Sequence, residues 1–178
     1  MPTYVAFLRA INLGATRKLP MALVKEHLPA AGYTDVDTYL ATGNVRVTTG
    51  ARSAAKVRAD LEKRFADAGG FEVPTAVLTP AELSATYDEA VALDVDAVRR
   101  YVAFLPDPPS DEARAALADW DTAGEGVHLG ARHLHWWTDG GTTTARIFQP
   151  AQLKRLGLQL ATTRDLKVVT TLAERWGV

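Results

Sequence analysis

The chain of 178 residues contains no cysteine. Disulfide bonds, zinc sites built from thiolates and cysteine nucleophiles are therefore excluded. The absence of cysteine fits a reducing compartment, so we expect a cytoplasmic protein. The beginning of the chain lacks the basic and apolar regions of a signal peptide, and no stretch reaches the roughly 18 apolar residues of a membrane span. We expect no association with a membrane.

The sequence also has almost no net charge, because 20 basic side chains balance 21 acidic ones. A net charge of -1 gives no broad electrostatic attraction to nucleic acid, which is therefore not expected as a partner. Glycine-rich nucleotide fingerprints and the serine nucleophile elbow are missing as well, and no cofactor is predicted. No nucleophile or base can be named, so the sequence neither predicts an enzyme nor excludes one.

The strongest positive feature is a repeated pentapeptide. Tyr-Val-Ala-Phe-Leu occurs at Tyr4–Leu8 and again at Tyr101–Leu105. Each copy is almost continuously apolar, which is typical of a strand buried on both faces. The repeat predicts one structural unit written twice, with halves at residues 1–93 and 94–178 that pack together as one compact body.

Hydrophobic periodicity and turn residues predict the order β-α-β-β-α-β in each half. In the first half we expect strand Tyr4–Leu8, helix Met21–Ala31, strands Asp37–Ala41 and Val45–Thr49, a helix capped by Ser53 that ends near Ala68, and strand Glu72–Leu78. In the second we expect strand Tyr101–Leu105, helix Asp111–Trp120, strands Gly126–Gly130 and His133–Trp137, helix Gln149–Leu156, and strand Ala161–Arg164. Trailing helices are expected at Pro80–Ala90 and Leu166–Trp176.

This order predicts an α+β protein formed by tandem duplication of a ferredoxin-like β-α-β-β-α-β unit. Its sheets would be antiparallel, with the helices on one face. The first and closing strands of each half are expected at the centre of the sheet.

The two halves differ most between their first strand and first helix. The first half carries the segment Arg9–Lys18, where the second has only the connector Pro106–Pro109. The cations Arg9, Arg17 and Lys18, together with the amide of Asn12 and the permissive Gly14, are suited to an anion-binding loop. The segment also leads into a helix N-terminus, which favours negative charge. The alternative is a solvated, flexible loop.

Two further segments allow a structural and a functional interpretation. Thr42, Gly43 and Asn44 either form a tight turn or add hydrogen bonds to a ligand beside Arg9. In Thr162–Asp165, a threonine or the aspartate caps the last helix, or Arg164 at the start of that helix is a second anion contact.

Four stretches resemble the DUF1697 family of uncharacterised bacterial proteins. Arg9–Gly14 resembles the family signature Arg-Gly-Ile-Asn-Val-Gly-Gly, although Ala15 stands in place of the second glycine of its final pair. The other stretches are Lys18–Met21, Tyr39–Asn44 and Ala161–Asp165. The resemblance is expected to span the whole chain, and the family it points to supplies no reaction.

The histidines form the one pattern that resembles a metal site. A two-residue turn at Ala131–Arg132 would pair His128 with His135 and place both on one sheet face with His133. Three imidazoles on one face resemble a zinc or copper site. No acidic residue lies between them in the hairpin, and three surface histidines without a metal is the favoured interpretation.

The leading hypothesis is a protein that binds a small anionic ligand, bearing phosphate or carboxylate, at the loop after the first strand. One alternative is a nucleic-acid- or protein-binding module without catalysis. Another is an enzyme with an apolar pocket in a duplicated α+β barrel, lined by Phe104 and Trp136. We expect a monomer or a homodimer. The predicted ligand contacts are Arg9, Asn12, Gly14, Arg17, Lys18, Thr42, Gly43, Asn44 and Arg164.

Overall fold

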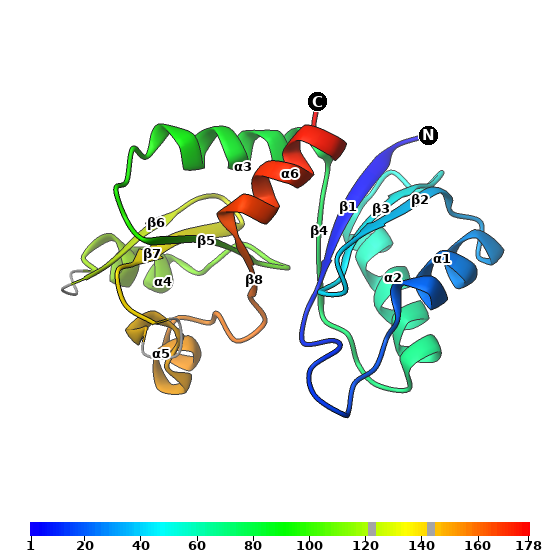
Figure 1. Ribbon diagram of the computed structural model, residues 1–178, viewed down its shortest axis with the longest axis horizontal. Coiled ribbons are helices and arrows are strands. Elements are labelled where there is room, and N and C mark those ends of the chain that lie inside the picture. Colours follow the sequence, from blue (N-terminus) through cyan, green and yellow to red (C-terminus); the bar gives the residue numbers. More distant parts are fainter. Residues whose placement is uncertain (121–123, 142–144) are drawn as a thin grey trace. The chain divides into compact units, whose positions relative to one another are not determined.

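A computed structural model describes residues 1–120, 124–141 and 145–178 of the chain (Figure 1). These residues form two compact units. The first unit comprises Met1–Ser84 and Leu172–Val178, and the second comprises Ala85–Thr171.

The first unit contains a four-stranded antiparallel sheet with the strand order β2-β3-β1-β4. Its elements are β1 (Thr3–Leu8), α1 (Met21–Ala30), β2 (Thr34–Tyr39), β3 (Asn44–Thr48), α2 (Ala54–Gly69) and β4 (Thr75–Leu78), followed by the start of α3 (Pro80–Ala92).

Helices α1 and α2 cover one face of this sheet (Figure 1). Their apolar stripes bury Leu28 and Phe65 against Ala6 and Leu8 of β1. The side chain of Ser53 accepts a hydrogen bond from the backbone N–H of Lys56, which confirms the predicted cap of α2.

The second unit also contains a four-stranded antiparallel sheet, with the order β6-β7-β5-β8. Its elements are β5 (Arg99–Phe104), α4 (Asp111–Ala118), β6 (Glu125–Leu129), β7 (His133–Thr138), the short 3-10 helix η1 (Arg146–Phe148), α5 (Pro150–Arg155) and β8 (Thr162–Asp165), followed by the start of α6 (Leu166–Trp176). The strands β1 and β5 contain the two copies of the pentapeptide, apart from the leucine that follows β5.

Two expectations about the sheets are wrong. Among the residues that the structure describes, the closing strands β4 and β8 lie at sheet edges, where β4 pairs with β1 and β8 pairs with β5. Burial on both faces shows that a strand is covered, but it does not fix the position of that strand within the sheet. In the second unit, moreover, helices contribute to both sheet faces: Leu117 of α4 packs in the core with Leu134, whereas Glu89 of α3 contacts His133, whose side chain points to the opposite face.

The boundary between the two compact units runs through α3, and the end of α6 belongs to the first unit. There the indole Nε1 of Trp176 and the guanidinium of Arg175 both donate to the carboxylate of Asp37 on β2, each over 3.0 Å. These contacts explain why the last residues group with a strand far earlier in the chain.

No helix formed by the described residues combines the length and the apolar character needed to cross a membrane.

Candidate functional site

The loop Arg9–Lys18 connects β1 to α1, at one end of the first sheet. The end of β1 is held by a hydrogen bond from the backbone N–H of Leu8 to the carbonyl of Gly43, 2.8 Å long. The next N–H, of Arg9, donates to the carbonyl of Pro74 over 2.9 Å. The structure thus brings the loop and the Thr42–Asn44 turn together, as the anion-site hypothesis requires.

Asn12 closes this loop through its side chain. Its amide oxygen accepts the backbone N–H of Leu19 at 2.9 Å, and its amide nitrogen donates to the carbonyls of Leu19 at 3.0 Å and Ala41 at 2.7 Å. Both amide hydrogens are therefore used within the protein. Asn12 therefore fixes the conformation of the loop. Its side chain is not placed to orient a ligand, which is the role that the sequence had suggested.

Arg17 has a comparable structural role. Its Nε donates to the carbonyl of Ala10 and a terminal nitrogen donates to the carbonyl of Glu72, both over 2.7 Å. The guanidinium also lies 4.6 Å from the ring centroid of Phe71, a cation–π distance. Two carbonyls and an aromatic ring hold this cation against the protein, so it stabilises the loop.

The backbone of the loop is strained. Ala10, Asn12 and Arg17 adopt left-handed conformations, with φ of 54°, 54° and 55°, and Gly14 has φ of 61°. Each such conformation costs a non-glycine residue about 1 kcal/mol or more. The hydrogen bonds of Asn12 and Arg17 offset this cost.

The remaining predicted contacts of the first unit divide into exposed and structural residues. Lys18, Gly14 and Thr42 are exposed, and Arg9 is half-buried. Gly43 is required by the fold, because it has φ of 85° and a Cβ there would lie 2.7 Å from the Cβ of Leu8.

The side chain of Asn44 is fully enclosed within the turn. It donates to the carbonyl of Tyr39 at 2.7 Å and to the hydroxyl of Thr42 at 3.3 Å. The tight-turn interpretation therefore accounts for both Gly43 and Asn44.

Arg164 belongs to the second unit, on β8. Its guanidinium is enclosed and donates to the hydroxyl of Thr162 and the carbonyl of Thr163, each over 2.9 Å. Burial lowers the pKa of Arg164 to about 10. The carboxylate of Asp165 accepts the backbone N–H of Lys167 at 2.8 Å, which confirms the predicted cap of α6.

The histidine hairpin has the predicted register. His128 pairs with His135 across β6 and β7, and His133 shares their face. Sequence reasoning missed Glu89 of α3, whose carboxylate contacts His128 and His133 at 2.8 and 2.5 Å. No pattern near the hairpin indicates this residue, because it lies 44 positions before His133.

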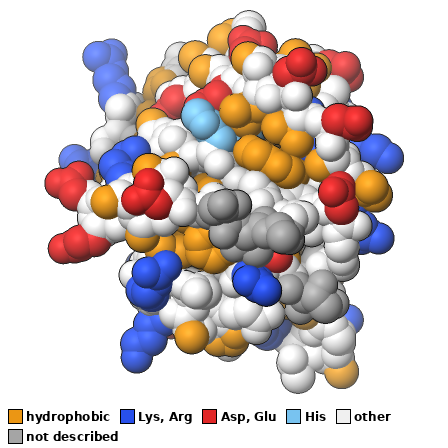
Figure 2. Space-filling model, turned by 90° about the vertical axis from the view of Figure 1, so that its left-hand side faces the viewer, with side chains coloured by type: hydrophobic (Ala, Val, Ile, Leu, Met, Phe, Trp, Pro, Cys, Tyr) orange, Lys and Arg blue, Asp and Glu red, His pale blue; other side chains and the backbone are white. Residues whose placement is uncertain are grey.

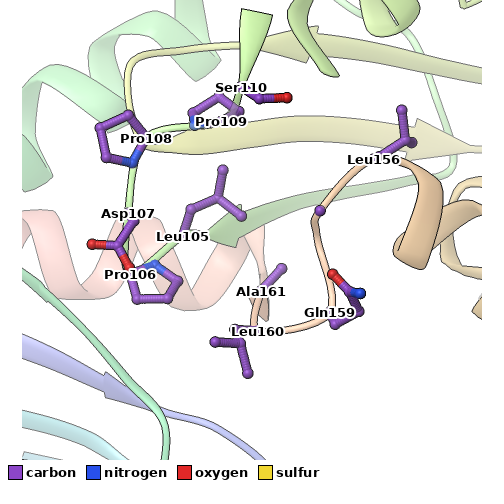
Figure 3. Close-up of a pocket in the computed structure, with 11 residues that line it drawn as sticks. Leu105, Pro106, Asp107, Pro108, Pro109, Ser110, Leu156, Gln159, Leu160 and Ala161 are labelled. Carbon is purple, nitrogen blue, oxygen red and sulfur yellow. The ribbon is translucent and has the colours of Figure 1, made fainter. Parts of the chain in front are cut away.

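A pocket of about 280 Å³ lies beside the connector that follows β5 (Figure 3). Pro106, Pro108 and Pro109 line one side, and Leu156 and Leu160 line another. The hydroxyl of Ser110 accepts a backbone N–H at the start of α4, so it serves as a helix cap. The lining is mostly apolar, and Asp107, Ser110 and Gln159 are its polar side chains.

A pocket lined jointly by Phe104 and Trp136 is excluded by the register of the sheet. Phe104 pairs with His133 and Tyr101 pairs with Trp136, so the phenylalanine and the tryptophan point to opposite faces. Trp136 is instead a core residue, stacked on Tyr101 with ring centroids 4.5 Å apart.

The chain matches the model of a family described as "Protein of unknown function (DUF1697)" over residues 1–135. The match ends before Ala161–Asp165, the last of the four similar stretches. A solved structure, that of the conserved bacterial protein SP0830 from Streptococcus pneumoniae, has 20% sequence identity and a TM-score of 0.75, with 97% of each chain covered. This similarity concerns the fold. No curated protein matches the chain.

Proposed function

The chain belongs to the DUF1697 family, whose function is unknown, and we propose that its loop Arg9–Lys18 binds a small anionic ligand bearing phosphate or carboxylate.

The observation that carries the proposal is the strained and clamped backbone of this loop. Ala10, Asn12 and Arg17 hold left-handed conformations within eight residues, and hydrogen bonds to Leu19, Ala41 and Glu72 keep them there. Strain of this kind concentrates at ligand clamps, where a fixed backbone avoids an ordering cost on binding. A solvated, flexible loop would need neither the strain nor the clamps.

In this proposal the exposed Lys18 is the cation that contacts the ligand, and the half-buried Arg9 is the first residue of the same loop. Lys18 comes shortly before α1, whose start at Met21 is capped by no side chain of the described residues. The positive end of the helix dipole therefore adds to the attraction for an anion. Asn12 and Arg17 act as clamps, and the enclosed Arg164 is not part of the proposed site.

The proposal is tested by titrating the protein with inorganic phosphate, pyrophosphate and a dicarboxylate in a calorimeter. Lys18→Ala should weaken binding about tenfold or more, since a charge-assisted hydrogen bond contributes roughly 1.5–3 kcal/mol. Lys56→Ala is the matched control, because Lys56 is an exposed lysine of the same unit outside the loop. Equal affinity in wild type and Lys18→Ala, or an equal loss in both variants, would contradict a site at this loop.

We also infer that the halves 1–93 and 94–178 descend from one duplicated ferredoxin-like unit. The support is the equivalent strand order of the two sheets and the pentapeptide at the equivalent strands β1 and β5. Superposition of β1–β4 on β5–β8 tests this inference. A poor superposition with a different strand order would refute it.

We further propose a cytoplasmic location and a monomeric or homodimeric state. The absence of cysteine supports the location. Cell fractionation tests the location, and light scattering tests the assembly.

A further inference from the structure

We propose that the second unit binds a divalent metal ion of the zinc type between Glu89, His133 and His135. The proposal concerns the second unit and does not depend on the anion-binding loop proposed for the first unit.

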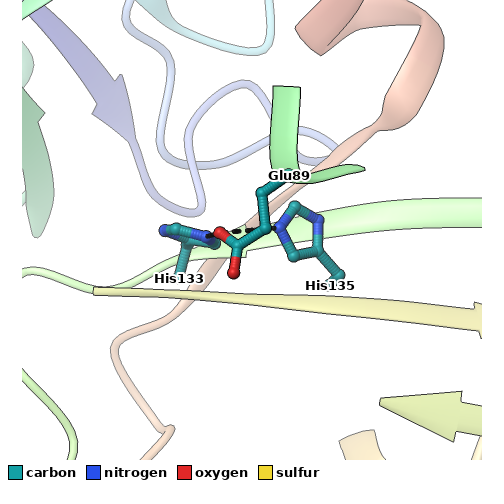
Figure 4. Close-up of side chains that lie close together, drawn as sticks. All are labelled: Glu89, His133 and His135. Atoms are coloured by element: carbon teal, nitrogen blue, oxygen red, sulfur yellow. Dashed lines mark hydrogen bonds and ion pairs between the residues drawn. The ribbon is translucent and has the colours of Figure 1, made fainter. Parts of the chain in front are cut away.

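The three side chains converge from two elements. Glu89 lies on α3, while His133 and His135 are alternate residues of β7 and therefore share a face. The carboxylate of Glu89 lies between the two imidazole rings (Figure 4). One ligand atom from each residue lies within 4.8 Å of the other two.

Two imidazole nitrogens and one carboxylate oxygen form a donor set that zinc accepts in proteins. Zinc–ligand bonds of about 2.0–2.1 Å place tetrahedral ligands about 3.3 Å apart. The Oε2 atom of Glu89 is 3.4 Å from the Nε2 atom of His135, which matches this spacing, and 2.5 Å from the Nε2 atom of His133. Binding thus requires the His133–Glu89 pair to separate by less than one ångström, and it requires the three ligand atoms, which span up to 4.8 Å, to draw together to this spacing.

His135 supplies a second observation. Its side chain is almost fully enclosed, and its Nε2 atom forms no hydrogen bond of normal geometry with the described residues, although it lies 3.4 Å from the Oε2 atom of Glu89. This nitrogen is directed toward Glu89 (Figure 4). A metal ion bound to that nitrogen would give it the strong partner that the 3.4 Å contact with Glu89 does not provide.

Two neighbouring side chains orient the ligands. The hydroxyl of Thr86 lies 3.4 Å from the Nδ1 atom of His133, which leaves Nε2 for the metal. The Nε2 atom of His128 lies 2.8 Å from the Oε1 atom of Glu89, which leaves Oε2. Such second contacts fix ring and carboxylate orientation in known metal sites.

The site has access to solvent on one side. The side chains of His128 and Glu89 are 43% and 33% exposed. Histidine atoms reach the molecular surface beside hydrophobic side chains (Figure 2). Three protein ligands leave a fourth position for water.

The direct test uses untagged protein stripped with a chelator and titrated with Zn²⁺ in a calorimeter. We expect one ion per chain in wild type. Glu89→Gln, which preserves side-chain volume, should weaken binding at least ~100-fold, and His128→Ala about tenfold, as loss of an orienting contact does. His27→Ala is the matched control, because His27 is an exposed histidine of α1.

Folding of each variant is checked by circular dichroism. Co²⁺ added to the wild-type protein should give the visible absorption of a four-coordinate ion, a result that needs no variant. The proposal is overturned by folded wild type that takes up no Zn²⁺, by binding as tight in Glu89→Gln as in wild type, or by binding lost in His27→Ala. In the first case the cluster is a set of hydrogen bonds between one carboxylate and its histidines.

Discussion

Substitution of Asn12 tests whether this residue holds the loop between β1 and α1. Its two hydrogen bonds to Leu19 are partly buried, whereas the one to Ala41 is exposed and water can replace it. Loss of two partly buried bonds costs about 2 kcal/mol. Alanine at φ of 54° adds roughly 1 kcal/mol of strain, because asparagine tolerates the left-handed region better. We therefore expect Asn12→Ala to lower the free energy of unfolding by about 3 kcal/mol.

Asn12→Gly separates the two contributions. Glycine loses the same hydrogen bonds but adopts positive φ without strain, so its cost should be about 2 kcal/mol. Leu13→Ala is the control, since Leu13 is the next residue and is 61% exposed. It should change stability by less than about 0.5 kcal/mol.

The measurement is urea denaturation followed by circular dichroism and by tryptophan fluorescence. Trp176 is the tryptophan of the first unit, and it reports on the unit that contains Asn12. An Asn12→Ala protein within about 0.5 kcal/mol of wild type would refute the clamp. An Asn12→Gly protein less stable than Asn12→Ala would refute the strain argument.

Three other substitutions give distinct outcomes. Although burial raises the pKa of Asp37, the hydrogen bond from Trp176 and nearby positive charges outweigh it, so the folded pKa lies below the unfolded one. Asp37→Asn should therefore lower the free energy of unfolding by about 1 kcal/mol at neutral pH. It should also remove part of the stability loss that the wild type shows below about pH 4. Acid titration followed by circular dichroism measures this, and an acid profile identical to that of the wild type would contradict it. Gly43→Ala should destabilise the protein by about 2 kcal/mol or more, because the new methyl group collides with Leu8. A midpoint of urea denaturation equal to that of the wild type would exclude the clash. Ala10→Gly should stabilise by about 0.5 kcal/mol by relieving the left-handed backbone, and a thermal midpoint below wild type would show that no strain exists there.

The sequence was most informative where structure depends on local pattern. The pentapeptides at Tyr4–Leu8 and Tyr101–Leu105 predicted the buried strands β1 and β5 within two residues. Cap chemistry located the start of α2 at Ser53. For α6 it left a threonine and Asp165 as alternatives, and the structure shows that Asp165 is the cap. These signals are contained within a few residues, so neighbouring parts of the fold do not alter them.

The candidate sites depended on partners far along the chain. Arg17 has the chemistry of an anion contact, but the carbonyl of Glu72, 55 positions later, occupies one of its donors. Glu89 completes the histidine cluster only because α3 passes over the face of the sheet that carries His133. The type of a residue predicts what its side chain can bind, whereas the topology of the fold determines which partner lies next to it.

In the DUF1697 signature Arg-Gly-Ile-Asn-Val-Gly-Gly, a glycine follows the arginine. This chain has Ala10 at that position, after Arg9. At φ of 54° this position suits glycine, which gives a physical reason for that residue in the signature. With alanine at this position, the loop conformation depends on the hydrogen bonds of Asn12 and Arg17.

The division of the chain into units has a consequence for protein synthesis. The second unit is one continuous segment, whereas the first is completed only by Leu172–Val178. Asp37 meets Arg175, which is translated 138 residues later. During synthesis on the ribosome, all residues of the second unit are therefore present before the first unit is complete. Strand β2 emerges long before Arg175 and Trp176, which bind the carboxylate of its Asp37.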